Sequence, residues 1–194
     1  MTIDPSGLEQ VFTSARTFNT FTKQPVTDDT LRQLYDLMRW GPTSMNSQPG
    51  RYVFLRSPES RRRLIPALAP GNQAKTLSAP MTIIVAQDAR FFDHLPTQFA
   101  AYDAKPMFQA NATLAESTAF RNSSLQGAYL IIAARLLGLD CGAMSGFDPA
   151  KVNAEFFPDG QWKVNFLINV GYGDASANYP RGPRLAFENV AKIL

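Results

Sequence analysis

The sequence predicts a domain that mixes α-helices and β-strands around one sizeable core. Short runs of β-branched and apolar residues, typical of buried strands, alternate with segments whose apolar residues recur at helical spacing. Hydrophobic residues make up 45% of the 194 residues and charged residues 18%, which is an ordinary globular balance. Because no repeat, low-complexity tract or linker divides the chain, we expect a single domain over residues 1–194.

The composition also indicates where in the cell the protein is expected. No apolar run approaches the roughly 20 residues of a membrane span, and the first residues lack the basic and apolar regions of an export signal. The single cysteine, Cys141, excludes an internal disulfide. We therefore expect a cytoplasmic protein without a membrane partner.

The net charge of +3 raises the question of a nucleic-acid partner. The basic residues are dispersed, however, and the one run, residues 61–63, is expected on the solvated side of a short helix. Nucleic-acid binding proteins carry a clustered basic patch. We therefore expect no nucleic-acid partner, and a few cations aimed at an anionic ligand explain the surplus as well.

The first helix is expected over about residues 7–15, with Ser6 as its N-cap and Glu9 at the capping-box position. The segment that ends this helix contains Ser14 and Arg16. From the residues alone, a cation near the last helical carbonyls is favoured over a contact of these two side chains with an anion or a flavin.

A second helix begins after Thr27, a favourable N-cap, and ends at Gly41. Its apolar residues share one face and predict a buried stripe: Leu31, Leu34, Tyr35 and Met38. The loop at residues 41–49 follows, and a strand is expected at residues 51–56. The loop carries amides, hydroxyls and two prolines with almost nothing apolar, so we interpret it as a polar cradle for a small planar ligand.

A helix from Pro58 to about residue 69 leads towards a strand at residues 81–86. That strand is apolar on both faces and is therefore expected at the centre of a sheet. Just before it, Asn72 and Lys75 share a face if they lie in a helical turn. They are either part of a solvated loop or a pair of donors aimed at one ligand edge.

Residues 88–112 are expected to form an irregular segment rich in aromatic side chains. The segment is too long and too aromatic for an ordinary connection, which favours a lid or a pocket wall. It holds the only histidine, His94, which has no partner at metal-ligand spacing and is expected on the surface.

The longest helix is expected over residues 115–137, and it is apolar nearly all round from residue 125 onwards. Such a helix is buried, so we expect it at the centre of the molecule, where packing on its equivalent in a second chain is also open. Residues 140–149 follow. They form either a tight strand-to-helix turn or a glycine-containing segment whose backbone approaches a ligand closely. Residues 162–173 predict another central strand, and residues 186–194 a short helix.

Several familiar catalytic motifs are absent from the sequence. It contains no nucleophile elbow, phosphate-binding loop, dinucleotide fingerprint or zinc spacing. Cys141 has no histidine base near it in the sequence and is not expected to act as a nucleophile. Amides, hydroxyls and isolated cations remain, and such groups suit the binding of a cofactor that supplies the chemistry.

Six short motifs occur in an order and spacing that is specific, although each alone is weak. They lie at residues 14–17, 41–49, 71–75, 120–124, 144–148 and 171–174. With them the chain resembles, over nearly its whole length, the nitroreductase family of FMN-dependent oxidoreductases. It is most similar to the malonic-semialdehyde-reductase-like subfamily that is linked to pyrimidine breakdown.

The resemblance implies an α+β fold, a three-layer α-β-α sandwich with a central, mostly antiparallel sheet. It also implies an intertwined homodimer with FMN at the interface, in which each C-terminal tail embraces the partner. Carried over by position, Ser14, Arg181 and Arg184 would bind the FMN phosphate. Arg16 would lie near the ribityl chain and the N1–C2 edge of the flavin.

The resemblance further implies contacts to the flavin ring. Asn72 and Lys75 would meet its pyrimidine edge, and Met144, Ser145 and Gly146 would lie along its face. The other subunit would contribute five residues of the cradle: Pro42, Thr43, Ser44, Asn46 and Gln48.

Two positions depart from the pattern of the broader family. Many members have an additional phosphate-binding arginine where this chain has Phe12, and an acidic residue beside the flavin N5 where it has Ser145. The first change makes Arg181 more important for the phosphate. The second alters the polarity on the substrate side.

The expected function is that of an FMN-dependent NAD(P)H oxidoreductase with ping-pong kinetics. NADH or NADPH would reduce the flavin, and a small acceptor would then be reduced in the same pocket. By resemblance the acceptor is a small semialdehyde, with malonic semialdehyde becoming 3-hydroxypropanoate. The alternatives are a nitroreductase or quinone reductase of broad specificity and a flavin-binding protein with little turnover. No side chain is assigned a catalytic role, and no metal site is expected.

Overall fold

A four-stranded antiparallel sheet forms the middle layer of the computed structural model, which describes residues 2–194. The strand order is β1-β2-β4-β3, with these bounds: β1 (Gly50–Leu55), β2 (Met81–Asp88), β3 (Asp140–Met144) and β4 (Trp162–Gly171). Every residue of β2 is buried, which confirms the prediction of a central strand there. The register sets Ile84 opposite Leu167, and a bulge follows at Val85 and Ala86.

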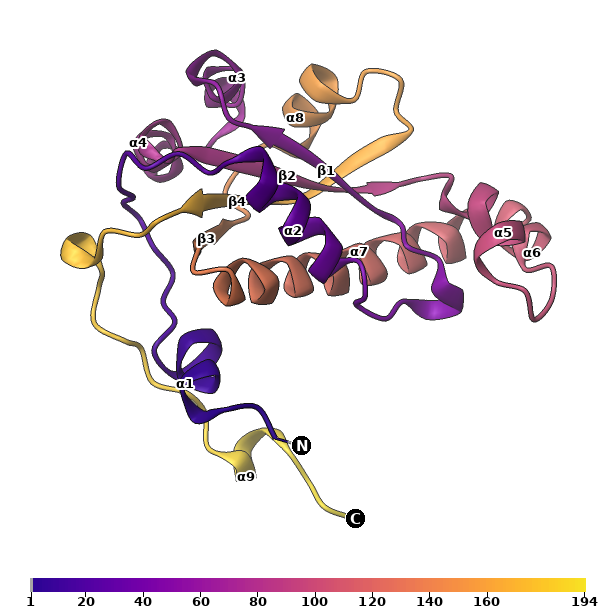
Figure 1. Ribbon diagram of the computed structural model, residues 1–194. Helices are drawn as coiled ribbons and strands as arrows, with labels where there is room; N and C mark the ends of the chain where they lie inside the picture. The colour runs from indigo at the N-terminus through magenta and orange to yellow at the C-terminus, as the bar shows by residue number, and fades with distance from the viewer. Residues whose placement is uncertain (1) are drawn as a thin grey trace.

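Helices cover both faces of the sheet (Figure 1). One face is covered by α2 (Asp28–Met38) and α7 (Ala112–Leu136), and the other by α3 (Pro58–Arg62), α4 (Pro70–Ser78) and α8 (Pro149–Phe156). Successive strand residues point to opposite faces, so Ile83 packs in the core with α2 and α7 while Ile84 packs in the core with α8. The expected α+β fold with an α-β-α arrangement is confirmed.

Helix caps explain several element boundaries. Thr27 caps α2 as predicted, and its hydroxyl accepts from Thr30 N at 3.1 Å. The predicted cap of the first helix is wrong, because Asp4, and not Ser6, accepts the free backbone N–H. That segment is also shorter than expected, since α1 (Pro5–Leu8) passes into the π-helical turn η1 (Glu9–Thr13).

The helix expected up to residue 69 is interrupted. After α3 the chain forms the 3₁₀ turn η3 (Ile65–Ala67) before α4 begins. The expectation that residues 61–63 are solvated is wrong for Arg61, which is buried and donates to Arg56 O and Pro80 O. These carbonyls lie at strand ends, where a guanidinium satisfies acceptors that no ladder partner reaches.

Residues 88–112, the lid segment, are ordered rather than irregular. They form η4 (Phe91–His94), α5 (Leu95–Gln98) and α6 (Lys105–Gln109) around a small core of their own. Phe91 and Phe108 meet edge to face at 5.0 Å between ring centroids. The aromatic residues that suggested a pocket wall therefore first serve to fold the segment, and His94 is exposed as expected.

The long helix α7 begins after Asn111, whose side chain accepts from Leu114 N. It is not buried all round, because the sheet covers only one side of it. Leu125 remains 46% exposed, and Tyr129 and Leu136 are also exposed in this chain. Among the helices of residues 2–194, even this longest one is not apolar enough to cross a membrane.

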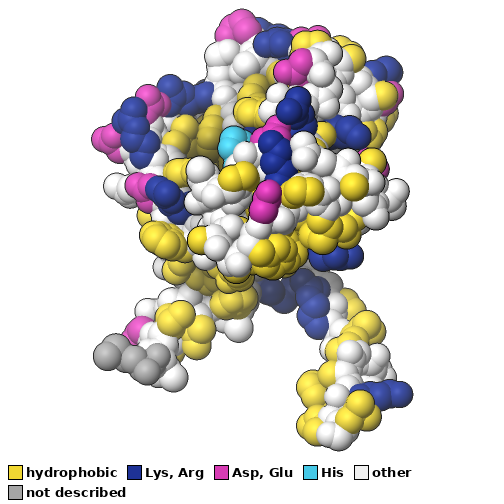
Figure 2. Space-filling model, turned by 90° about the vertical axis from the view of Figure 1, so that its right-hand side faces the viewer, with side chains coloured by type: hydrophobic (Ala, Val, Ile, Leu, Met, Phe, Trp, Pro, Cys, Tyr) yellow, Lys and Arg dark blue, Asp and Glu magenta, His cyan; other side chains and the backbone are white. Residues whose placement is uncertain are grey.

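Two arms project from the body (Figures 1 and 2). The N-terminal arm consists of α1 and η1, and the C-terminal arm contains η5 (Ala175–Ala177) and the four-residue helix α9 (Phe187–Val190), shorter than expected. Their exposed apolar side chains include Phe12, Tyr179, Leu185, Phe187, Val190 and Ile193. Such surface on extended arms is typical of a segment that packs on a partner.

Candidate functional site

A basic cavity of about 420 Å³ lies where the two arms leave the body. Figure 2 shows basic side chains gathered between the arms. The cavity is lined by four arginines and by no carboxylate: Arg16, Arg135, Arg181 and Arg184. This donor set matches a phosphate, because a guanidinium presents several N–H groups in a fork.

Backbone carbonyls hold these arginines in place. Arg181 Nη2 donates to Thr13 O at 2.8 Å and to Ala15 O at 2.9 Å, and Arg16 donates to Tyr179 O. These bonds also tie the two arms together. Each guanidinium carries five N–H groups, so donors remain for an anion in the cavity.

The family resemblance implied Ser14, Arg181 and Arg184 at the FMN phosphate and Arg16 near the ribityl chain, and the structure brings these three arginines into one cavity. Ser14 lies beside them at the end of η1, although it does not line the cavity. Sequence reasoning missed Arg135. It is in the last turn of α7, where it donates to Val11 O at 2.9 Å, and its position in an apolar helix gave no signal of a ligand.

Phe12, the position at which the family resemblance led us to expect an arginine in many members, also lines the basic cavity. Arg135 approaches the same cavity from α7. The fourth cation of the cavity is therefore Arg135, which comes from α7 and not from the position of Phe12.

A second polar cluster lies between α4 and the end of β3. Asn72 Nδ2 donates to Gly146 O at 2.8 Å, and Ala69 N donates to the same oxygen at 3.0 Å. A Cβ on Gly146 would lie 2.7 Å from Asn72 Nδ2, so the close approach requires glycine. Thr76 contacts Met144 Sδ at 3.8 Å. The predicted residues of these two segments are thus brought together.

The donors of this cluster are used differently from the prediction. Asn72 and Lys75 lie on one helix, α4, as the helical alternative required. One N–H of the Asn72 amide donates to Gly146 O, so the second N–H and the amide oxygen are left for a ligand. Lys75 is half-buried, whereas Ser145 is exposed.

The basic cavity and this cluster are connected through β3. Thr17 forms a parallel bridge with Cys141, and Met144 follows three residues later on the same strand. At about 3.3 Å per strand residue, the two ends are about 10 Å apart. An elongated ligand with an anionic end and a heteroaromatic end fits such a spacing.

The cradle loop, residues 41–49, contains the 3₁₀ turn η2 (Ser44–Asn46) and three unusual backbone conformations. Met45, Asn46 and Gln48 have φ of 53°, 48° and 41°. Left-handed φ in side-chain-bearing residues persists only where surrounding contacts impose it. Two such contacts come from α7, where Asn122 Oδ1 accepts from Ser44 N at 2.8 Å and Gln126 Oε1 accepts from Gly50 N at 2.7 Å.

The side-chain amides of the cradle loop are engaged with the lid segment. Asn46 Nδ2 donates to Gln98 O and Gln48 Nε2 to Gln98 Oε1, both at 2.9 Å. Thr43 Oγ1 accepts from Gln48 N. Pro42 and Ser44 complete the predicted set. The turn η2 of this loop lies beside α5, away from the arms (Figure 1). One chain therefore does not bring the cradle loop to the basic cavity.

A partly buried ion pair lies where the cradle loop meets the lid segment. Arg51 Nη2 lies 2.6 Å from Asp88 Oδ2, and Asp88 is 1% exposed. Arg51 Nη1 also donates to Gln48 O, and Asp88 N donates to Pro49 O. This junction was missed, because its only signal is a carboxylate at the end of an apolar strand.

The remaining titratable groups offer no nucleophile or metal site in the described residues. Burial raises the pKa of the Cys141 thiol to about 12, so the thiolate is not available at neutral pH. Burial likewise raises the pKa of Asp140, whose side chain accepts from Gly173 N. Residues 2–194 contain no group of three His, Cys, Asp or Glu side chains that is placed to hold a metal.

Comparison with known proteins identifies the family. The model of the Nitroreductase family matches residues 13–172. A protein of Rhodopseudomonas palustris, provisionally named NADH dehydrogenase/NAD(P)H nitroreductase, is 55% identical over 193 residues, which is 100% of this chain and 98% of the relative. Both the family model and this relative cover most of the chain.

Two solved structures share the fold. A provisionally named nitroreductase in complex with FMN, from Exiguobacterium sibiricum, gives a TM-score of 0.85 at 19% identity and covers 100% of this chain and 99% of its own. A provisionally named NAD(P)H:FMN oxidoreductase from Staphylococcus epidermidis gives 0.81 at 16% identity, with coverage of 100% and 98%. At these identities the two structures establish the fold. The family model and the bacterial relative show that the chain belongs to the nitroreductase family and is an oxidoreductase of that family.

Proposed function

We propose that the protein is an FMN-dependent NAD(P)H oxidoreductase. The observation that carries this proposal is the basic cavity, lined by four arginines and no carboxylate, with the polar α4–β3 cluster about 10 Å along β3. FMN has an anionic phosphate at one end and a heteroaromatic ring at the other. Bound there, it would supply hydride transfer between NAD(P)H and an acceptor.

Three arginines of the basic cavity, Arg135, Arg181 and Arg184, would hold the phosphate. Arg181 and Arg184 come from the C-terminal arm and Arg135 from α7, so the anion would fasten the arm to the body. Ser14, at the end of η1, would add a hydroxyl donor. Charge-assisted hydrogen bonds from several guanidinium groups compensate for the absence of an arginine at Phe12.

The α4–β3 cluster would hold the ring. Lys75 and the Asn72 amide would meet its pyrimidine edge, and Met144 to Gly146 would lie along its face. Arg16 would lie near the N1–C2 edge. A fixed cation at that edge stabilises the negative charge of the reduced ring, because its position does not need to be reorganised during the reaction.

We also propose that the protein acts as a homodimer. The cradle loop lies at the opposite end of the molecule from the basic cavity, so its five predicted residues reach a flavin only across a subunit interface. The exposed face of α7, with Phe120 and Leu125, and the apolar arms are the surfaces available for that interface. Burial of apolar surface of this kind is the main driving force of association.

The acceptor is proposed to be a small semialdehyde such as malonic semialdehyde, reduced to 3-hydroxypropanoate. The support is the resemblance to the malonic-semialdehyde-reductase-like subfamily. The name of the Rhodopseudomonas palustris relative favours a second candidate, an NAD(P)H nitroreductase or quinone reductase. The single-domain organisation and the cytoplasmic location stay predictions from the sequence.

The test is a visible spectrum of the purified, FMN-reconstituted protein, followed by anaerobic NADH or NADPH and then by a panel of acceptors. We expect a bound flavin that is bleached by the nicotinamide and reoxidised by malonic semialdehyde faster than by nitrofurazone or menadione. Absence of bound flavin contradicts the whole proposal. A flavin that NAD(P)H does not bleach indicates the low-turnover alternative, and faster reoxidation by the nitro compound or the quinone establishes the second candidate.

A further inference from the structure

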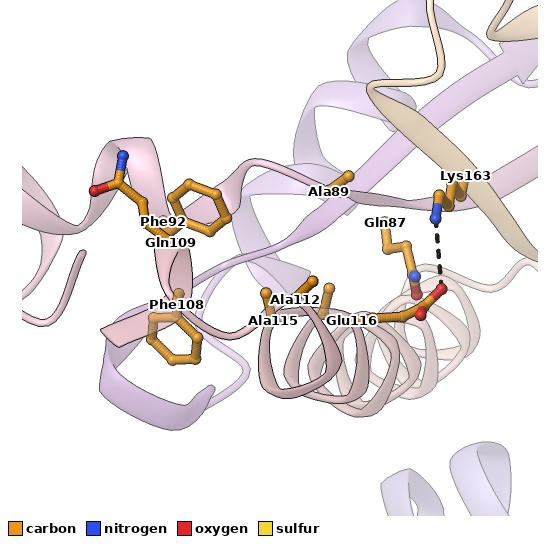
Figure 3. A pocket seen from close by; sticks show the side chains of 10 residues that line it. Gln87, Ala89, Phe92, Phe108, Gln109, Ala112, Ala115, Glu116 and Lys163 are labelled. Atoms are coloured by element: carbon orange, nitrogen blue, oxygen red, sulfur yellow. Dashed lines mark hydrogen bonds and ion pairs between the residues drawn. The ribbon is translucent and has the colours of Figure 1, made fainter. Parts of the chain in front are cut away.

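A second cavity, the lid cavity, lies between the lid segment and the body (Figure 3). Its volume is about 250 Å³. Phe92 of η4 and Phe108 of α6 wall it on one side, and Gln87 of β2 and Lys163 of β4 lie on the other. Three of the four α7 side chains that line it are small, namely Ala112, Ala115 and Ala119, and the fourth is Glu116. None of its residues belongs to the proposed flavin contacts.

The lid cavity contains an unsatisfied hydrogen-bond acceptor. Gln87 is 5% exposed, and within the described residues its side-chain oxygen Oε1 has no hydrogen-bond partner. Figure 3 shows the side chain directed from β2 towards α7, on the cavity side. A buried acceptor without a donor is unfavourable, and a bound molecule with a donor would remove that cost.

A loosely held ion pair borders the same side of the cavity. Lys163 Nζ lies 3.4 Å from Glu116 Oε1, and both side chains are about half exposed. An exposed pair of this kind contributes little to stability. It keeps the rim polar while the interior stays apolar, and the opposite charges leave no net charge for an ionic ligand to meet.

We propose that the lid cavity is a binding site for a small, neutral aromatic molecule that carries one N–H or O–H donor. Its ring packs between Phe92, Phe108 and the alanines of α7, since aromatic rings stack favourably edge to face. Its donor meets Gln87 Oε1. The cavity, at about 250 Å³, is smaller than the roughly 300 Å³ at which pockets for drug-sized ligands begin. It therefore takes a smaller molecule, of one or two rings.

The site joins elements that are otherwise separate. Phe92 and Phe108 belong to the lid segment, whereas Gln87 and Lys163 belong to the two central strands. A ligand between them therefore holds the lid segment against the sheet. The site follows from the cavity alone and does not depend on the proposed flavin chemistry.

The test uses indole and benzofuran as probes, because they have nearly the same shape and only indole has an N–H donor. Binding to the full-length, FMN-loaded protein is measured by isothermal titration and by saturation-transfer NMR. We expect indole to bind about five- to tenfold more tightly than benzofuran, the effect of one buried hydrogen bond. In Gln87→Leu this preference disappears, because the acceptor is replaced by an apolar side chain of similar size.

A second variant, Ala115→Leu, fills the cavity and is expected to abolish the binding of both probes. Its matched control is Ala110→Leu, which adds the same side chain at an exposed lid position outside the cavity lining. Circular dichroism verifies that each variant is folded. If Ala115→Leu does not fold, the ratio of the two affinities in Gln87→Leu decides.

Three outcomes would overturn the proposal. The first is that neither probe binds at millimolar concentration, which would mean that water alone fills the cavity. The second is that the preference for indole persists in Gln87→Leu. The third is that indole binds folded Ala115→Leu unchanged and alters the visible spectrum of FMN, which would place the probe on the flavin. Because the FMN-free protein is titrated in parallel, failure of the proposed flavin function is distinguished from failure of this site.

Discussion

The two ends of the molecule use their polar side chains in opposite ways. Between the arms, Arg16, Arg181 and Arg184 make a few bonds to backbone carbonyls and line an open basic cavity. At the far end, the amides of Asn46 and Gln48 are bonded to the lid segment. One end keeps donors for a ligand, whereas the other uses them to fix its own geometry.

This difference teaches that a polar loop is not evidence of a ligand in its own chain. The cradle loop holds strained φ values that the lid segment and α7 impose. The conformation of the cradle loop is therefore fixed before a ligand binds. A preordered surface binds with little loss of conformational entropy, which suits a loop that closes a site on another subunit.

The largest expected effect comes from separating the two subunits. In Leu125→Glu a charge is placed on the exposed apolar face of α7, and burying it in an interface is unfavourable. We expect a monomer that binds FMN at least 100-fold more weakly, although the basic cavity and cradle loop are unaltered. Analytical ultracentrifugation and flavin fluorescence measure the two effects.

The control for this prediction is Leu77→Glu, because Leu77 is exposed to a similar degree on α4, outside α7 and the arms. It should remain dimeric. A monomeric Leu125→Glu protein that retains FMN would show that the basic cavity does not need the cradle loop of a second chain.

The next effect concerns the junction of cradle loop and lid segment. Asp88→Ala leaves the partly buried Arg51 without its partner and frees Gln48 O from its fixed position. Loss of one member of a buried pair costs about 3 kcal/mol of unfolding free energy. Urea denaturation measures it. The exposed pair of Arg32 with Asp29 is the control, since Arg32→Ala should cost under about 0.5 kcal/mol.

The basic cavity is tested by Arg181→Ala. Removal of a guanidinium that meets the phosphate should weaken FMN binding by about 10- to 100-fold, equivalent to about 1.5–3 kcal/mol. Fluorescence titration of the FMN-free protein gives the dissociation constant. Arg32→Ala, on the far helix α2, should bind FMN normally. Equal affinity in the two variants would mean that the anion is held elsewhere.

A smaller effect is expected where α4 meets β3. In Gly146→Ala the added Cβ would lie 2.7 Å from Asn72 Nδ2, so the bond from Asn72 to Gly146 O must lengthen. We expect a loss of about 1–2 kcal/mol in unfolding free energy together with weaker FMN binding. Gly71→Ala is the matched control. Nothing lies within 4 Å of its Cβ, so it should be neutral or slightly stabilising.

The smallest expected effect is the contribution of Cys141, on β3, to the pH dependence of the unfolding free energy. The pKa of Cys141 is raised to about 12 by burial, so only the unfolded state loses the proton near pH 9. The contribution of Cys141 to stability is therefore complete below pH 8.5 and is lost as the pH rises towards 12. Between pH 8 and 9.5 we expect unfolding free energy to fall by about 1 kcal/mol more than in Cys141→Ala. Equal pH dependence of the two proteins would show that the thiol titrates freely.

Much of the fold could be predicted because the decisive signals are local. The β-branched run at residues 81–86 and the apolar run at residues 162–173 became the two central strands. Thr27 caps α2, as the sequence predicted. The four-residue α1, the interrupted helix after Pro58 and the ordered lid segment were not predicted, because distant contacts override local propensity there.

The candidate site was predicted as a set of residues rather than as a geometry. The sequence determined which side chains can meet an anion or a heteroaromatic ring, because residue type fixes charge and donor number. Tertiary structure decided which of them are free. It brought Arg135 from α7 into the basic cavity, directed the Asn72 amide to Gly146, and paired Arg51 with Asp88. These contacts join residues 37 to 124 positions apart, and such pairings depend on the packing of whole elements, which no local pattern encodes.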